Sequence, residues 1–208
     1  MTDAFFPATA MPDPDWWQAL WPDPRSVLDE MGVEAGMVVV DLCCGDGLFT
    51  APLCAMTSWV YAIDIDTEMI DRARTLVADT KASNCEFIVA DAMDIFIVAD
   101  AMDIEAVVLE PADYVFLANT FHGVPDKAGL ARAVAAILKP QGRFGIVNWH
   151  RRPREETVVL DQPRGPRTEM RMEPDEVAAT VEPVGLRLAQ FVELPPYHYG
   201  VIFEKPTT

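Results

Sequence analysis

Short apolar segments alternate with helical patterns along most of this 208-residue chain, and this alternation limits the folds that are open to it. The apolar segments are predicted to be buried strands, at Met37–Leu42, Trp59–Ile63, Phe87–Ala90, Tyr114–Ala118, Arg143–Trp149, Leu186–Leu194 and Tyr199–Glu204. The intervening patterns predict helices over 24–31, 48–57, 67–78, 126–138 and 173–181. Strands that alternate with helices form a mostly parallel sheet covered on both faces, which is an α/β fold.

The last two predicted strands differ from the others in their connection. Only Pro195, Pro196, Tyr197 and His198 separate them. A connection this short joins antiparallel neighbours, whereas a parallel pair needs a crossover of about a dozen residues or more. We therefore expect one antiparallel pair in an otherwise mostly parallel sheet.

The net charge and the composition of the chain indicate which kinds of binding partner and which compartment to expect. The chain has 33 acidic and 16 basic residues, which gives a formal net charge of −17 at pH 7. A field of this sign repels phosphate backbones and anionic lipids, so we expect no nucleic-acid and no membrane partner. The four cysteines form no CxxC pair, and we see neither a signal peptide nor an apolar run near the roughly 18 residues of a membrane span. We therefore expect free thiols and a cytoplasmic location.

A nine-residue segment, FIVADAMDI, occurs twice in tandem, at 87–95 and 96–104. Two short copies do not make a solenoid, so we interpret them as a local tandem duplication. The copies are identical, and therefore only their connections can decide which one forms strand three. The first copy keeps the link from the preceding helix short and moves the extra residues into a surface connection, where added length costs little. We predict that the first copy is strand three.

A strand, a glycine-containing turn and a helix follow one another between Val38 and Thr50. The strand ends near Asp41, the turn contains Gly45 and Gly47, and the helix N-terminus offers unpaired N–H groups. In open α/β sheets the ligand crevice lies beyond the carboxyl ends of the strands, where the strand order reverses. These residues mark a ligand site or, taken alone, a tight turn without a ligand.

Two carboxylates follow the next two strands. Asp64 ends strand two about 20 residues after the turn, where an acid can accept hydrogen bonds from both ribose hydroxyls of an adenosine ligand. Asp66 is better placed than Asp64 to cap the next helix, and Asp91 can accept from an adenine amino group at the end of strand three. A dinucleotide fits less well, because the third glycine of GxGxxG is missing and Asp46 would face a pyrophosphate. A ligand with a cationic centre, such as S-adenosylmethionine, suits these acids better.

Five segments resemble, in the same order, the motifs of class I S-adenosylmethionine-dependent methyltransferases, and most of all the quinone and small-molecule branch. They are Asp41–Gly47, Ile63–Asp64, Val89–Ala92, Asn119–Asp126 and Ala136–Phe144. The resemblance covers roughly residues 33–150. It implies a Rossmann-like α/β fold with a seven-stranded, mostly parallel sheet in the order 3-2-1-4-5-7-6, strand seven being antiparallel. Cys43 stands where the family's motif has its first glycine.

The resemblance also implies S-adenosylmethionine as the cofactor. The cofactor-binding residues that it implies are Asp41, Cys43, Gly45, Gly47, Asp64, Ile65, Asp91, Ala92 and Asn119. The S-adenosylmethionine-binding methyltransferase domain would cover 33–208 and follow a Pro- and aromatic-rich cap over 1–32. In that cap, Trp16, Trp17 and Trp21 either line the ligand site or form a helix packed on the core. Cys43 and Cys44 belong to a motif that acts through its backbone, so no metal site is expected.

Histidines and arginines are the candidates on the acceptor side. His122 follows strand four and His150 ends strand five, and either could be a catalytic general base or make structural hydrogen bonds. A basic stretch with six arginines, over residues 151–171, follows strand five. This stretch could bind an anionic acceptor or form a solvated loop balanced by its own acids. Those acids are Glu155, Glu156, Asp161 and Glu169.

The expected function is S-adenosylmethionine-dependent transfer of a methyl group to a small-molecule acceptor. Catalysis would depend mostly on proximity and alignment, because the leaving group is a neutral thioether that needs no proton. One alternative is a methyltransferase-like protein that binds S-adenosylmethionine without catalysis. The other is an NAD-linked oxidoreductase, against which the missing third glycine counts. The acceptor, the methylated atom and the oligomeric state do not follow from the sequence.

Overall fold

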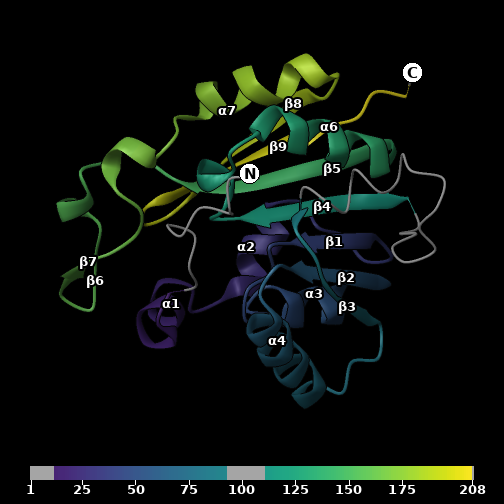
Figure 1. The fold of residues 1–208 in the computed structure, drawn as a ribbon, viewed down its shortest axis with the longest axis horizontal. Coiled ribbons are helices and arrows are strands. Elements are labelled where there is room, and N and C mark those ends of the chain that lie inside the picture. Colours follow the sequence, from purple (N-terminus) through teal and green to yellow (C-terminus); the bar gives the residue numbers. More distant parts are fainter. Residues whose placement is uncertain (1–11, 93–110, 208) are drawn as a thin grey trace, which may run out of the picture.

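A seven-stranded sheet in the order β3-β2-β1-β4-β5-β9-β8 forms the centre of the computed structural model, which describes residues 12–92 and 111–207 (Figure 1). Strands β1 to β5 pair in parallel, and β9 runs antiparallel to both β5 and β8. The predicted α/β fold, strand order and antiparallel final pair are therefore confirmed. The strands are β1 (Val38–Leu42), β2 (Trp59–Asp64), β3 (Cys85–Val89), β4 (Ala112–Ala118), β5 (Leu138–Trp149), β8 (Arg187–Leu194) and β9 (His198–Glu204).

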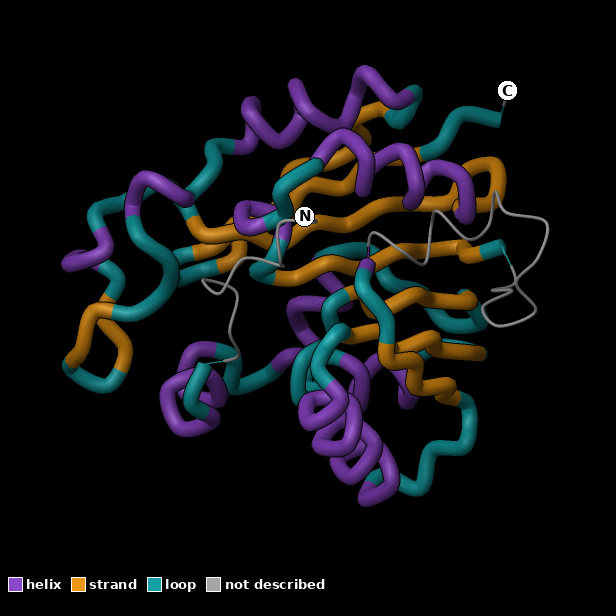
Figure 2. Tube along the Cα trace, in the orientation of Figure 1, coloured by secondary structure: helices purple, strands orange, loops and turns teal. Residues whose placement is uncertain are grey.

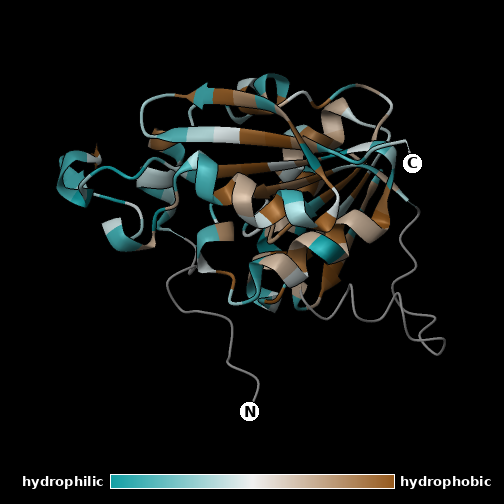
Figure 3. Ribbon diagram, turned by 90° about the horizontal axis from the view of Figure 1, so that it is seen from above, coloured by the Kyte–Doolittle hydropathy of each residue, from teal (hydrophilic) through white to brown (hydrophobic). Residues whose placement is uncertain are grey.

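Helices cover both faces of this sheet (Figure 2). On one face lie α6 (Lys127–Ile137) and α7 (Pro174–Val181), and on the other lie α2 (Pro24–Glu30), α3 (Thr50–Met56) and α4 (Thr67–Asp79). Consecutive residues of β4, Phe116 and Leu117, are both fully buried because they point into different hydrophobic clusters on opposite faces. Figure 3 shows the resulting concentration of hydrophobic residues in the strands. No helix among the described residues combines the length and the apolar character of a membrane span.

The predicted element boundaries hold within a few residues, except at β5. This strand begins at Leu138 rather than at the predicted Arg143. Leu138 pairs with Ala112 across an irregularity in the register, and the N–H of Gln141 donates to the carbonyl of Lys205 at 2.9 Å. These are contacts between distant parts of the chain, so hydrophobic periodicity gave no sign of the longer strand.

The first FIVADAMDI copy forms strand three, as predicted. Phe87 and Ile88 of this copy pair with Ala62 and Ile63 of β2. The second copy, at 96–104, lies outside the described residues.

The N-terminal tryptophans belong to the core beside α2 and α3. Trp16 and Trp17 lie in α1 (Pro14–Leu20), Trp21 follows it directly, and all three side chains are between 3% and 7% exposed. Their rings meet edge to face, at 5.6 Å between Trp16 and Trp17 and 6.0 Å between Trp17 and Trp21. The expectation of a helix packed on the core is confirmed, while the domain division at residue 32 stays a prediction.

Candidate functional site

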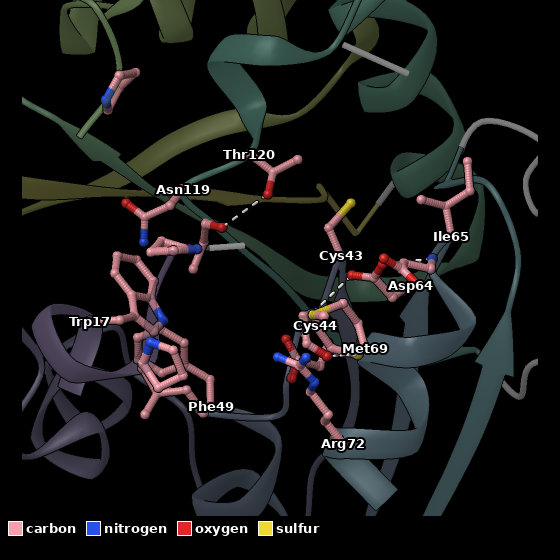
Figure 4. A pocket seen from close by; sticks show the side chains of 18 of the residues that line it. Trp17, Cys43, Cys44, Phe49, Asp64, Ile65, Met69, Arg72, Asn119 and Thr120 are labelled. Carbon is pink, nitrogen blue, oxygen red and sulfur yellow. Dashed lines mark hydrogen bonds between the residues drawn. The ribbon is translucent and has the colours of Figure 1, made fainter. Parts of the chain in front are cut away.

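A cavity of about 750 Å³ opens at the carboxyl ends of the parallel strands. It is lined by the turn after β1, the ends of β2 and β3, the segments after β4 and β5, and α1. Figure 4 shows Asp64 and Ile65 on one side of the cavity, with Trp17 and Asn119 on the other. This position agrees with the crevice expected where the strand order reverses between β1 and β4.

Asp41 lies in β1 at the bottom of the cavity and is only 3% exposed. Its Oδ2 accepts a hydrogen bond of 2.6 Å from the hydroxyl of Thr50, at the start of α3. Burial is the main cause that raises the pKa of Asp41 to about 7; the Thr50 hydroxyl opposes this shift, and the nearby charge of Asp64 adds to it. The carboxyl group is therefore close to its ionisation midpoint at neutral pH, where a ligand cation would favour its charged form.

Cys43 occupies the position where the family's motif has a glycine, and its backbone has the left-handed conformation that favours glycine, with a φ of 58°. The backbone path is therefore kept, at a strain of about 1–2 kcal/mol for a residue with a Cβ atom. The side chain of Cys43 lines the cavity, and burial raises the pKa of its thiol, which stays protonated. All four cysteines are free thiols, as expected.

Asp64 ends β2 and is tied to the turn after β1. Its Oδ2 accepts from the N–H of Gly45 at 2.9 Å, and its Oδ1 accepts from the N–H of Asp66 at 3.0 Å. Each carboxylate oxygen has a further lone pair for a ligand hydroxyl. Asp66 caps α4 through a 2.8 Å bond from the N–H of Glu68. The division of roles expected from the sequence, in which Asp66 and not Asp64 caps the helix, is confirmed.

The other proposed cofactor residues fall into two groups. Gly45, Ile65, Ala92 and Asn119 line the cavity, together with Asp41, Cys43 and Asp64. Gly47 and Asp91 are not among the lining residues, although Ala90 and Ala92 on either side of Asp91 are.

Gly47 has a packing role instead. It has a φ of +90°, and a Cβ atom here would lie 2.8 Å from the Cα of Ala73 in α4. The absence of a side chain therefore lets α4 pack closely against the turn.

Two polar residues after β4 present unsatisfied groups. Among the described residues, the buried side-chain nitrogen and oxygen of Asn119 have no hydrogen-bond partner, and neither has the buried Nε2 of His122. Both residues line the cavity. Burial is the main cause that lowers the pKa of His122 to about 4; the Asn148 side chain opposes this shift, and the charges of Lys127 and Arg171 add to it. The imidazole is therefore neutral at pH 7. Buried groups of this kind are normally paired, which indicates a polar ligand at this end.

The structure does not bring His150 into the cavity. Its Nε2 lies 2.9 Å from Oε2 of Glu193 in β8, and its ring packs on Tyr199 at 5.1 Å. The neighbouring residue Trp149 lines the cavity instead. Sequence reasoning chose the wrong one of two adjacent residues as a cavity residue, because the side of the sheet on which each lies is set by pairing with β9.

Sequence reasoning also left several lining residues unassigned. Arg154 and Arg164 were part of an undivided basic stretch, whereas Trp149 and Phe49 were not singled out. Trp16 and Trp17 line the cavity, while Trp21 packs against Phe49 at 5.7 Å and does not line it. The tryptophans of α1 thus both pack on the core and face the site, so the two expectations do not exclude each other.

Comparison with known proteins identifies the family. A family model described as "Methyltransferase domain" matches residues 33–182. The ubiquinone biosynthesis O-methyltransferase of Xanthomonas axonopodis pv. citri is 26% identical over 153 residues, which are 66% of this chain and 57% of that protein. The demethylmenaquinone methyltransferase of Staphylococcus aureus is 27% identical over 121 residues, 57% of this chain and 45% of that protein. The chain thus spans about half the length of these curated relatives.

A solved structure supports the same assignment. The structure of a SAM-dependent methyltransferase from Aquifex aeolicus superimposes with a TM-score of 0.73 at 26% identity, covering 92% of this chain and 93% of that one. The family model alone matches more than half of the chain, and it includes the turn after β1, Asp64 and the segment after β4. The resemblance inferred from the motifs is confirmed, and the chain belongs to the methyltransferase domain family.

Proposed function

We propose that this protein is an S-adenosylmethionine-dependent methyltransferase that acts on a small-molecule acceptor. The observation that carries the proposal is the arrangement of Asp64 and Asn119 in one cavity of a methyltransferase-family chain. Asp64 is held by the turn at Gly45 with lone pairs to spare, and the Asn119 amide is buried without a partner. The named activities of the relatives point in the same direction.

The lining residues suit the parts of this cofactor. Asp64 would accept hydrogen bonds from the ribose hydroxyls, and Ile65, Met69 and Ala92 offer apolar contacts for the adenine ring. Asp41, with its pKa raised to about 7 mainly by burial, would hold a negative charge towards the ammonium group of the cofactor's amino-acid end. Contact between Asp91 and the adenine amino group stays a prediction.

When bound, S-adenosylmethionine supplies a sulfonium methyl group for transfer to a nucleophile, and a neutral thioether leaves. His122 lies in the segment after β4 and is neutral, and its buried Nε2 has no hydrogen-bond partner in the described part of the chain. We assign it the role of general base, which accepts the acceptor's proton at Nε2 if the nucleophile is protonated. His150, which pairs with Glu193 outside the cavity, is left with a structural role in this proposal.

We also propose a cytoplasmic location and a partner that is not a nucleic acid. Four free thiols are usual in a reducing compartment. The net charge of −17 opposes a polyphosphate partner.

Calorimetric titration with S-adenosylhomocysteine tests the proposed function, with NAD as the competing ligand. We expect the wild type to bind S-adenosylhomocysteine and not NAD. Asp64→Asn should weaken this binding by about 1.5–3 kcal/mol, or roughly 10- to 100-fold, because charge-assisted hydrogen bonds have this strength. Asp79→Asn, which changes an exposed carboxylate at the end of α4, is the matched control and should bind as the wild type does.

Three results would contradict the proposal. They are no binding of S-adenosylhomocysteine, a preference for NAD, and an equal loss of affinity in the two variants. Measuring the consumption of S-adenosylmethionine with a panel of acceptors then separates an enzyme from a protein that only binds the cofactor.

A further inference from the structure

The segment that follows β5 contributes one part of the cavity wall. Arg154 lies in a short 3-10 helix, Arg154–Glu156. Arg164 follows a small hairpin formed by β6 (Val158–Val159) and β7 (Gln162–Pro163). Both side chains line the cavity. In the sheet, β5 is separated from β2 by β4 and β1, so these arginines and Asp64 approach the cavity from different sides.

Arg164 presents a guanidinium group without an anionic partner. Its Cζ lies 5.3 Å from the centre of the Trp16 ring, a cation–π contact that fixes the plane of the group against α1. Its Nε is buried, and over residues 12–92 and 111–207 it has no hydrogen-bond partner. Such a donor is normally satisfied in a folded protein, because leaving it unpaired away from water is unfavourable.

The acids of the same segment do not neutralise it. Across the described residues, no ion pair joins Arg154 or Arg164 to a carboxylate, including the four acids between 155 and 169. The Nε of Arg154 instead donates to the carbonyl of Gly165 at 3.0 Å, which ties its position to that of Arg164. Among the described residues, the acids of this segment therefore leave the guanidinium groups of Arg154 and Arg164 without a direct ion pair.

A third arginine fixes this segment and adds to its positive field. Arg171 is 1% exposed, and its guanidinium donates to the carbonyls of Pro166, Arg152 and Arg164 and to the Thr157 hydroxyl, at 2.9–3.3 Å. These acceptors are neutral dipoles, and the charge of Glu155 favours the charged form of Arg171 against the lowering of its pKa by burial and by Arg154. Arg171 is a positioning residue, because it binds backbone groups on both sides of the cavity-lining arginines.

Aromatic side chains bound the same cavity. Trp17 and Trp149 both line it, one from α1 and the other from the end of β5. Flat apolar walls with a few convergent charged groups are typical of sites for small aromatic ligands.

We propose that the methyl acceptor is a small aromatic carboxylate, whose carboxylate binds Arg164 and Arg154 and whose ring lies between Trp17 and Trp149. This inference rests on the proposed function. Guanidinium groups bind a carboxylate through paired N–H donors, which fixes both its position and its orientation. The ring would then extend towards His122 and Asn119, which line the same cavity.

The test compares 3,4-dihydroxybenzoate with its neutral amide, 3,4-dihydroxybenzamide, by calorimetry at pH 7.5 in the presence of saturating S-adenosylhomocysteine. The two probes share a ring and hydroxyl groups and differ in charge. We expect the wild type to bind the carboxylate at least about tenfold more tightly, as a charge-assisted hydrogen bond implies. In Arg164→Gln this preference should fall below about threefold, while the affinity for S-adenosylhomocysteine stays unchanged. Arg167→Gln is the matched control, because Arg167 is an exposed arginine of the same segment that does not line the cavity.

Each other result overturns the inference in an identifiable way. If the wild type binds both probes equally, the acceptor site does not select an anion, even where S-adenosylhomocysteine binding shows the proposed function to be sound. This comparison needs no variant and holds even if Arg164→Gln fails to fold. An equal effect of Arg167→Gln would indicate general electrostatics. A loss of S-adenosylhomocysteine affinity in Arg164→Gln would place the arginine at the cofactor, and no S-adenosylhomocysteine binding by the wild type would remove the proposed function itself.

Discussion

Replacing Asp41 by asparagine should flatten the dependence of the protein's stability on pH. Burial raises the pKa of this carboxyl group from 3.8 to about 7 in the folded state. In the unfolded chain the group returns to its ordinary value. The folded protein therefore holds an extra proton between about pH 4 and pH 7, and the free energy of unfolding falls as the pH rises through this window.

The size of the effect follows from the shift. Each pKa unit corresponds to 1.36 kcal/mol, so the full shift corresponds to about 4 kcal/mol, of which roughly 2–3 kcal/mol is lost between pH 5 and pH 8. Asparagine cannot ionise, so the Asp41→Asn protein does not lose this part of the free energy of unfolding as the pH rises. Its amide oxygen can still accept the hydroxyl of Thr50, so the hydrogen bond now made at 2.6 Å is retained.

The measurement is urea unfolding at pH 5 and pH 8, followed by tryptophan fluorescence. We expect the wild type to lose about 2–3 kcal/mol more than Asp41→Asn between these two pH values. The buried histidines, His122 and His198, act in the opposite direction because their pKa values are lowered, but both proteins contain them. Asp79→Asn removes the same formal charge from an exposed site and controls for net charge. If the free energy of unfolding depends on pH in the same way for all three proteins, Asp41 is not a buried carboxyl group with a raised pKa.

Two further predictions concern the turn and the proposed base. Gly47→Ala should destabilise the fold by about 1–3 kcal/mol more than Gly36→Ala in urea unfolding. Both glycines have a positive φ, but only at Gly47 would a Cβ atom meet Ala73. Equal losses of stability would show that α4 does not pack on the turn as described. His122→Gln should lower kcat by about 100-fold or more, with S-adenosylhomocysteine affinity within about twofold of the wild type. If kcat stays within about threefold of the wild-type value for an acceptor that must lose a proton, His122 is not the base.

Most of the fold could be predicted from the sequence, because the information is local. A strand that is buried on both faces needs apolar residues at consecutive positions. Phe116 and Leu117 of β4 are such residues, buried on opposite faces, and the other central strands show the same pattern. The short link between β8 and β9 left only an antiparallel pairing. Asp64 and Asn119 could be placed because the carboxyl ends of parallel strands meet at one edge, whatever the helices between them do.

The tertiary structure alone decided which neighbouring side chains face the cavity. Trp149 and His150 are adjacent, and the pairing of Trp149 with His198 in β9 turns the first to the cavity while His150 meets Glu193. The sequence predicted that Gly47 contacts the ligand, whereas the structure shows that a glycine is needed there because Ala73 packs against it. Arg164 was one of six equivalent arginines in the sequence. Its cation–π contact with Trp16, which is far away in the chain, distinguishes it. The sequence by itself determined which strands and turns exist and where they meet, since these depend on local burial patterns. The direction of a side chain at the end of a strand depends on partners far away in the chain, and only the folded structure brings those partners together.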